Sequence, residues 1–315
     1  MKKVLVIQYS QTGQLSRVVE SICEPLAKSE DIELFTETLV PVIPYPYPWS
    51  FFGFLDVFPE CVALDAPDNK PLSIDIEEDF DLVILAYQVW FLAPSLPVTA
   101  FLKSESGKCL LNGKPVVTVI GCRNMWSQAQ ETVKKLLIAS SAKLIDNIVL
   151  TDQGSTLDSF ITTPRWLLTG KKDAFWRFPP AGISQLDIDR ACRFGHALAQ
   201  GLTKISAKID APLLTGLQAV KADLSQIQSE KAGIKSFTIW GRLLRKVGCS
   251  GDFRRKPILV LYLVFLVILI LSVVPLTVLL KKTLSPFLVN KYQKIKQYYE
   301  LPSGSGSERM NNFDC

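Results

Sequence analysis

The feature that most constrains this chain is its opening: an apolar segment, a polar turn and a helical pattern follow one another without interruption. Residues 4–7 are valine, leucine and isoleucine, residues 9–14 spell Tyr-Ser-Gln-Thr-Gly-Gln, and Val18, Val19 and Ile22 recur at helical spacing. A buried strand that ends in such a turn presents backbone N–H groups and a helix N-terminus to an anion. The opening therefore predicts an α/β fold with an anion-binding loop.

The composition of this loop narrows the range of anions that it could bind. No Lys follows Gly13, as it does in the loops that bind nucleoside triphosphates, and no G-x-G-x-x-G run is present for a dinucleotide. A monophosphate is the better candidate. The alternative, that Ser10 and Thr12 only cap the following helix, stays open from these residues alone.

Strand and helix patterns alternate over the first two hundred residues. Near-continuous apolar strands that alternate with helices indicate a parallel sheet covered on both faces, that is, a doubly wound sheet of five strands. The expected strands are 4–9, 32–38, 82–86, 115–121 and 148–150, and the expected helices are 14–28, 96–103, 127–139 and 185–200.

Three of the loops that follow these strands carry polar or aromatic side chains. They span residues 10–14, 87–94 and 122–126. Because ligands of such sheets bind beyond the carboxyl ends of the strands, at the point where the strand order reverses, we expect these loops to form one site.

A long apolar run predicts a C-terminal membrane helix. No residue from 257 to 280 is charged, and a helix of this length reaches about 36 Å, more than the apolar thickness of a bilayer. We expect a membrane anchor over residues 254–282, in the bacterial inner membrane with the main domain facing the cytoplasm. A re-entrant anchor is the alternative.

The segments on either side of this run are basic. The net charge is only +5, so the basicity is local, and no nucleic-acid partner is expected. Residues 206–253 predict amphipathic helices at the surface of a lipid bilayer, and residues 283–315 predict a basic segment and a flexible tail. The basic residues concerned are Arg242, Arg245, Lys246, Arg254, Arg255, Lys256, Lys281, Lys282, Lys291, Lys294 and Lys296.

Residues 1–205 resemble the flavodoxin-like family, which includes flavodoxins and FMN-dependent quinone reductases. The matching segments are the strand that ends in residues 9–14, the stretch 81–94 that leads to Phe101 and Leu102, and residues 116–121 with their following loop. The resemblance implies that FMN is bound, its phosphate by the first loop and its ring by the other two. The cofactor-binding residues implied are Ser10, Gln11, Thr12, Gly13, Gln14, Leu15, Gln88, Trp90, Phe91, Gly121, Cys122, Arg123 and Asn124.

One position departs from the family pattern. The last hydroxyl residue of the phosphate loop is usually Thr, and here Leu15 occupies that position, followed by Ser16. The loss of one charge-assisted hydrogen bond costs about 1.5–3 kcal/mol where nothing replaces it.

Two aromatic-rich insertions, near residues 40–78 and 152–183, extend the compact domain. Taken together they predict either walls for an apolar substrate or segments that simply pack over the sheet. The candidate substrate-lining residues are Trp49, Phe51, Phe54, Trp126, Trp166 and Trp176.

The first insertion and the apolar run together look like the flavodoxin-like proteins of bacterial dialkylresorcinol and flexirubin-type pigment biosynthesis. That resemblance implies oxidative aromatisation of a lipid-like dialkylcyclohexanedione made by a partner ketosynthase. The alternatives are an NAD(P)H:quinone reductase and a flavin-free scaffold that tethers a biosynthetic partner to the membrane.

The remaining chemistry-bearing residues give little. The single histidine, His196, lies in a helical pattern and is expected to be structural, so no metal site and no histidine-based catalytic group is predicted. The seven cysteines are scattered without a C-x-x-C pair and are expected to be reduced thiols. No catalytic residue is assigned.

Overall fold

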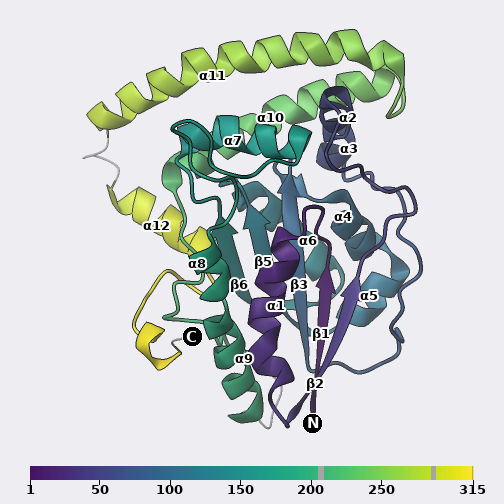
Figure 1. Cartoon of the computed structure of the whole chain (residues 1–315), viewed down its shortest axis with the longest axis vertical. Helices are drawn as coiled ribbons and strands as arrows, with labels where there is room; N and C mark the ends of the chain where they lie inside the picture. The colour runs from purple at the N-terminus through teal and green to yellow at the C-terminus, as the bar shows by residue number, and fades with distance from the viewer. Residues whose placement is uncertain (205–208, 285–288, 314) are drawn as a thin grey trace.

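The centre of the molecule is a parallel sheet with helices on both faces and a further group of helices across one end (Figure 1). The computed structural model describes residues 1–204, 209–284, 289–313 and 315, and of these it describes the backbone alone at 270, 271, 273–284 and 289–292.

The sheet has the strand order β2-β1-β3-β5-β6, with all five strands parallel. A sixth strand of two residues, β4, pairs antiparallel with the end of β3. The order reverses between β1 and β3, as it does in flavodoxin-like sheets, so the predicted doubly wound sheet is observed. The strands are β1 (Lys2–Gln8), β2 (Ile32–Thr38), β3 (Leu82–Trp90), β4 (Ala93–Pro94), β5 (Pro115–Cys122) and β6 (Lys143–Thr151).

The helices between strands cover the two faces of the sheet. α1 and α9 pack side by side on one face, and α4, α5 and α6 lie on the other (Figure 1). The helix expected over 185–200 is two helices, α8 and α9, which are separated near Arg190. The helices are α1 (Gln14–Ala27), α4 (Leu96–Lys103), α5 (Glu105–Leu111), α6 (Ser127–Ala139), α8 (Gln185–Asp189) and α9 (Cys192–Lys204).

The helices α2, α3, α7, α10 and α11 gather over the carboxyl ends of the strands (Figure 1). Two of them, α2 and α3, come from the first insertion, and α7 comes from the second. The amphipathic region expected over 206–253 contains one long helix, α10, while residues 211–223 are not helical. The boundary near residue 205 lies outside the described residues. The helices are α2 (Phe51–Asp56), α3 (Phe58–Ala63), α7 (Thr156–Thr169), α10 (Leu224–Val247) and α11 (Lys256–Leu284).

The expected membrane helix is corrected by the structure. Within the part of the chain that is described, no helix combines the length and the apolar character that crossing a bilayer requires. The prediction of a membrane helix over 254–282 was therefore wrong. The predicted location, in the bacterial inner membrane with the main domain facing the cytoplasm, was wrong as well.

The apolar run instead begins with turns that pack on the protein itself. Leu259 and Tyr262 of α11 are buried against Phe58 of α3 and Leu244 of α10. The Phe58 and Tyr262 ring centroids are 4.8 Å apart. Aromatic side chains of the first insertion thus supply an apolar surface for this end of α11.

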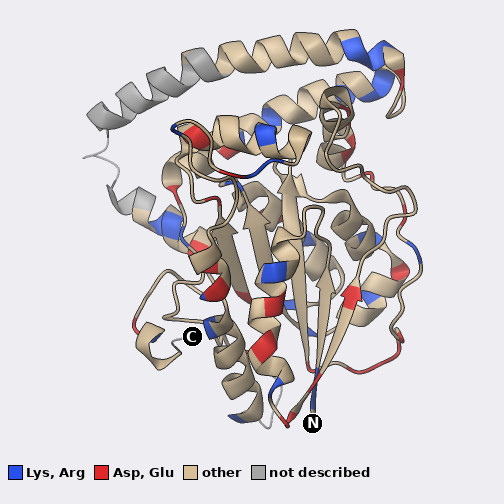
Figure 2. Ribbon diagram, in the orientation of Figure 1, with Lys and Arg blue, Asp and Glu red and all other residues tan. Residues whose placement is uncertain are grey.

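A buried arginine fixes the start of α11. Arg255 ends the short helix η1 (Phe253–Arg255) and forms ion pairs with Asp56 and Glu60, from α2 and α3. Figure 2 shows Lys and Arg residues, in blue on the ribbon, where α10 ends and α11 begins. One member of this basic group, Arg255, is therefore neutralised inside the protein and not presented to a surface.

The C-terminal segment is packed, although a flexible tail was expected. After α12 (Val289–Glu300) it lies along β6, where Ser303 is fully buried, and it ends beyond η3 (Met310–Asn312). Gln218 and Val220 donate backbone hydrogen bonds to Gly306 and Gly304. Residues 285–288 of the expected basic segment lie outside the described residues.

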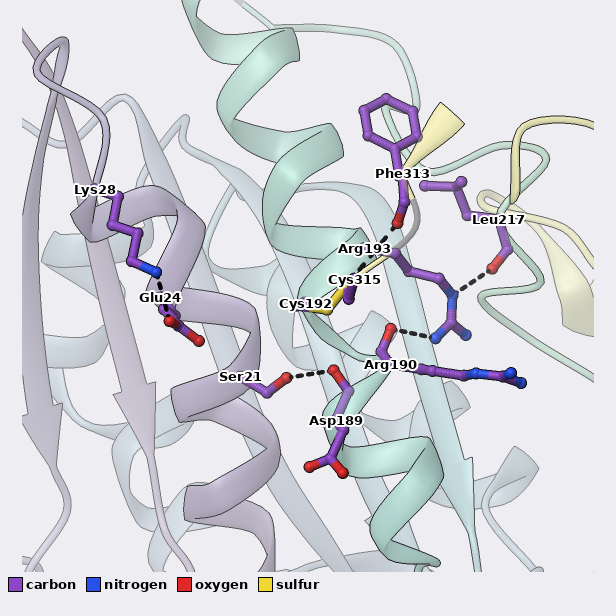
Figure 3. The surroundings of a disulfide bond; sticks show 10 residues. All are labelled: Ser21, Glu24, Lys28, Asp189, Arg190, Cys192, Arg193, Leu217, Phe313 and Cys315. Atoms are coloured by element: carbon purple, nitrogen blue, oxygen red, sulfur yellow. Dashed lines mark hydrogen bonds and ion pairs between the residues drawn. A yellow bond between two sulfur atoms is a disulfide. The ribbon is translucent and has the colours of Figure 1, made fainter. Parts of the chain in front are cut away.

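A disulfide joins this segment to the main domain. Cys192, at the start of α9, is bonded to Cys315, beside Arg193 and Phe313 (Figure 3). The expectation that all cysteines are reduced is corrected for this pair, because the packed C-terminal segment brings two distant cysteines together. The other five cysteines are free.

Candidate functional site

The loop after β1 has the features of an anion site. Gly13 is the N-cap residue of α1 and has φ +74°, and this residue provides no side chain to cap the first turn of the helix. The Ser10 hydroxyl is buried, and within the described residues it has no hydrogen-bond partner. The Thr12 hydroxyl accepts a long hydrogen bond, 3.5 Å, from the Gln14 backbone N–H. A buried hydroxyl without a partner beside a helix N-terminus fits a phosphate group.

Two glutamines tie this loop to the surrounding segments. The Gln11 backbone N–H donates to Gln88 Oε1 of β3 at 3.2 Å, and the Gln11 side chain donates to the Pro46 carbonyl of the first insertion. The loop is therefore held across the switch point between β1 and β3.

The Gln14 side chain lines the cavity described below and also joins the loop to the second insertion. Its Oε1 accepts from the Ile183 backbone N–H at 3.0 Å, and its Nε2 donates to the Ile183 carbonyl at 3.2 Å. Gly182 has φ +90°, and a Cβ there would lie 2.5 Å from Gln14 Oε1 and 2.9 Å from the Trp166 ring. Only glycine fits this close approach, which joins the second insertion to the loop.

A cavity of about 140 Å³ lies at this edge of the sheet. It is bordered by most of the residues predicted to bind the cofactor and by two of the predicted substrate-lining residues. The predicted residues that line it are Gln11, Thr12, Gln14, Leu15, Gln88, Trp90, Phe91, Gly121, Cys122, Arg123, Phe54 and Trp166.

The other predicted residues lie elsewhere. Ser10 and Gly13 are in the loop beside the cavity without lining it, and the Asn124 side chain donates to the Thr156 hydroxyl at 3.4 Å. Trp126 is buried before α6, Trp49 is buried in an aromatic cluster, and Phe51 makes an edge contact with Phe52. Trp176 is 86% exposed on a turn.

Two aromatic groups form the wall on the side of β3. Trp90 makes edge contacts with Tyr9, Tyr45 and Trp49, at centroid distances of 5.9, 5.0 and 5.9 Å. Phe91 packs on Phe54 at 4.8 Å. These contacts hold the rings of Trp90 and Phe91 in place.

The backbone is strained where β3 ends. Phe91 and Leu92 have φ +49° and +64°, a region that residues with a Cβ seldom adopt. Strain of this kind is stored at binding sites when the surrounding packing holds it in place. Here the aromatic contacts of Phe91 provide that packing.

Two charged residues, Arg123 and Asp152, also line the cavity. The Arg123 guanidinium stacks on the Phe160 ring, 4.2 Å from the centroid. Burial lowers the pKa of this guanidinium, and the negative charge of Asp152 opposes that shift. Asp152 accepts hydrogen bonds from the Gly154 and Gly182 backbone N–H groups, and burial, the dominant effect, raises its pKa above the ordinary value.

Several lining residues were missed by the sequence analysis. They are Val89, Asp152, Thr163, Leu167, Gly182 and Ile183. Asp152 follows the strand at 148–150, so the rule applied to the earlier strands would have found it. Val89 lies in β3, inside the expected loop 87–94. Thr163, Leu167, Gly182 and Ile183 come from the second insertion, whose path over the sheet no local pattern gives.

The cavity is narrow for a flavin. Its volume is below the roughly 300–1,000 Å³ of most ligand pockets, and Trp166 and Leu167 of α7 restrict it on one side. The loop offers donors to a phosphate, whereas the observed volume is small for a tricyclic ring. The residues present thus fit FMN at its phosphate end.

The comparisons with known proteins give structural neighbours only. No family model matches the chain, and no curated protein matches it. A flavoprotein from Bacteroides eggerthii DSM 20697 is 19% identical, with 48% of this chain and 89% of that chain covered and a TM-score of 0.38. A flavoprotein in complex with FMN from Lactobacillus acidophilus NCFM is 17% identical, covering 47% and 93%, with a TM-score of 0.37. A flavodoxin from the domain Archaea is 11% identical, covering 64% and 99%, with a TM-score of 0.36.

Proposed function

We propose that this chain is an FMN-dependent oxidoreductase. The observation that carries the proposal is the buried Ser10 hydroxyl, which lacks a partner within the described residues, beside the N-terminus of α1. A hydroxyl and the backbone N–H groups of a helix N-terminus, close together at this point of the chain, are the groups that a phosphomonoester needs. The cavity next to this point lies at the switch point of the sheet, where ligands of this fold class bind.

The chemistry is divided between cofactor and protein. FMN would supply a two-electron acceptor. Ser10, Thr12 and the first turn of α1 would hold its phosphate. Because the Leu15 side chain has no donor, a backbone N–H would have to replace the hydroxyl that Thr provides at this position in the family. Trp90 and Trp166 border the cavity, and they would flank a flat ring bound there.

The finer proposal concerns the substrate. The aromatic walls suit an apolar ring, and the resemblance to the pigment-forming flavodoxin-like proteins suggests a dialkylcyclohexanedione supplied by a ketosynthase. Converting such a ring to a dialkylresorcinol removes two hydrogens; bound FMN would be the two-electron acceptor and solvent would take the proton, and the gain of aromaticity favours the product. No residue of the cavity is assigned as the proton acceptor.

The cofactor assignment is tested by binding. The apoprotein is titrated into FMN and the quenching of flavin fluorescence is followed, for the wild type, Ser10→Ala and Ser21→Ala. Ser21 lies on the same helix and donates to the Asp189 carbonyl, away from the loop. We expect Ser10→Ala to weaken binding about ten- to hundredfold and Ser21→Ala to leave it unchanged. Wild-type protein that does not bind FMN would favour the flavin-free scaffold.

The reaction is tested separately. The FMN-loaded protein is mixed without oxygen with a dialkylcyclohexanedione or with NADPH, and the visible flavin absorbance is followed. Bleaching by the dione, with resorcinol detected by mass spectrometry, supports aromatisation. Bleaching by NADPH alone supports the quinone reductase instead.

A further inference from the structure

Arg123 differs from the other arginines that stack on aromatic rings. Its guanidinium lies 4.2 Å from the Phe160 centroid and borders the cavity, but among the described residues it makes no hydrogen bond or ion pair with the protein. Arg165 and Arg193 also stack on rings, and both donate hydrogen bonds, to Asp173 and to the Leu217 carbonyl. Arg177 also stacks on a ring without a hydrogen bond or ion pair among the described residues, but it is exposed and does not line the cavity. Arg123 therefore combines unused donors with a place in the cavity wall.

The nearby carboxylate does not take these donors. Asp152 Oδ1 accepts from the Gly154 N–H at 2.7 Å, and Asp152 Oδ2 accepts from the Gly182 N–H at 2.5 Å. The Asp152 backbone N–H in turn donates to the Arg123 carbonyl at 3.0 Å, so Asp152 fixes the backbone of Arg123. The backbone of Arg123 is thus held by Asp152 and its guanidinium by the Phe160 ring, and the hydrogen-bonding edge is left to a ligand.

The chemistry of a guanidinium defines that ligand. It is a planar fork of N–H donors that binds planar oxyanions with two parallel hydrogen bonds. A half-buried guanidinium without an acceptor gains more from such a ligand than an exposed one does, because it has already lost much of its water. The adjoining wall is apolar, with Trp166 and Leu167, so the ligand needs a flat apolar body.

We propose that Arg123 binds the oxyanion of the second reactant, an enolate or phenolate carried on a flat apolar ring. This inference rests on the proposed function and deepens it, because it gives the charge state in which the substrate enters. In this proposal the Arg123 side chain binds the substrate, whereas the resemblance to the flavodoxin-like family implies that it binds the cofactor. Arg123 is then a specificity-determining residue that selects the ionised form of the substrate over a neutral ring.

The test uses two probes of one shape and different charge. Dimedone is a cyclic dione that exists as its enolate at neutral pH, and its O-methyl enol ether is neutral. Both are titrated by calorimetry into the FMN-loaded wild type, Arg123→Gln, Arg123→Lys and Arg177→Gln. Arg177 is the matched control, since it stacks on Trp176 at the surface and does not line the cavity.

We expect the wild type to bind the enolate at least about tenfold more tightly than the ether. Arg123→Gln should lose that preference, and Arg123→Lys should keep part of it, because Lys retains the charge without the fork. Arg177→Gln should behave as the wild type does. Equal binding of the two probes by the wild type, or an unchanged preference in Arg123→Gln, would overturn the proposal.

Two further measurements separate this inference from the proposed function. If Arg123→Gln binds FMN about tenfold more weakly and keeps its preference for the enolate, the side chain serves the cofactor and the inference is wrong. If the wild type binds no FMN, the proposed function fails, and the same titrations on the apoprotein still decide whether Arg123 selects the enolate. Thermal melting of each variant establishes that it is folded, and Arg123→Lys provides the comparison if Arg123→Gln is not.

Discussion

Glu230 of α10 accepts a hydrogen bond from the Ser127 hydroxyl at the start of α6, over 2.8 Å. The same carboxylate oxygen accepts from the Gln128 backbone N–H at 2.9 Å. Glu230 is only 1% exposed. The contact joins the helix that crosses the end of the sheet to the helix that follows the Arg123 loop, so the packing of α10 and the shape of the candidate site are linked.

This contact makes the stability of the protein depend on pH. Burial raises the pKa of Glu230 from 4.5 to about 7, against the effect of its hydrogen bonds. Because the folded protein holds this proton more tightly than the unfolded chain does, the free energy of unfolding decreases as pH rises from about 5 to about 8. We expect Glu230→Gln, which keeps an acceptor but cannot ionise, to remove up to about 3 kcal/mol of that decrease.

The measurement is urea unfolding of both proteins across this pH range. Burial also raises the pKa of Asp146, to about 6, but Asp146 is present in both proteins and its contribution cancels in the difference. Parallel pH profiles for the wild type and Glu230→Gln would show that the carboxylate is already ionised in the folded state.

Arg255 gives a second prediction. It is fully buried, its Nε lies 3.0 Å from Asp56 Oδ1, and its two terminal nitrogens each lie 3.1 Å from a Glu60 oxygen. Replacement by Met leaves two carboxylates without their partner, so we expect Arg255→Met to lower the free energy of unfolding by about 3–5 kcal/mol.

The neighbouring residue is a matched control for this prediction. The side chain of Arg254 is 62% exposed and pairs with Asp252, so Arg254→Met should cost less than about 1 kcal/mol. Both variants are compared by urea unfolding. Similar losses in the two variants would mean that the Arg255 contacts contribute no more than a surface ion pair.

Ser303 gives a third prediction, for the C-terminal segment. Its hydroxyl donates to Asp146 Oδ1 and accepts from the Asn147 backbone N–H, both at 2.7 Å and both buried. Ser303→Ala leaves both groups of β6 without this partner and should cost about 1–3 kcal/mol of unfolding free energy. Ser307→Ala, at an exposed position of the same segment, should change it little. A loss of the same size in both would contradict the buried role of Ser303.

The elements that could be predicted are those with strong local patterns. The ranges of β2, α4 and α6 match the expected ones, because each is bounded by a clear change of apolar period or by a turn residue. The candidate site could be predicted once the strands were known, because the topology of the sheet brings the loops after β1, β3 and β5 to one edge.

The parts that could not be predicted depend on contacts between distant residues. Hydropathy alone gives the run after Pro257 the character of a lipid-facing segment, but it contains nothing about Phe58, whose ring packs on Tyr262. Likewise, the Ser-Gly repeat near residue 305 is typical of a flexible tail, and only the buried Asp146 explains why Ser303 is held. The partner in each case lies far along the chain.

The disulfide between Cys192 and Cys315 gives the last prediction. Their separation is 123 residues, and a cross-link over a long loop stabilises a protein by restricting its unfolded chain, typically by about 2–4 kcal/mol. We expect Cys315→Ser, or reduction of the wild type, to lower the free energy of unfolding by that amount, and Cys109→Ser, at an exposed free cysteine, to leave it unchanged. Alkylation under denaturing conditions, with and without reductant, counts the paired cysteines by mass. If the oxidised wild type exposes every cysteine to the reagent, or if the reductant has no effect on unfolding, the segment is held by the Ser303 contacts alone.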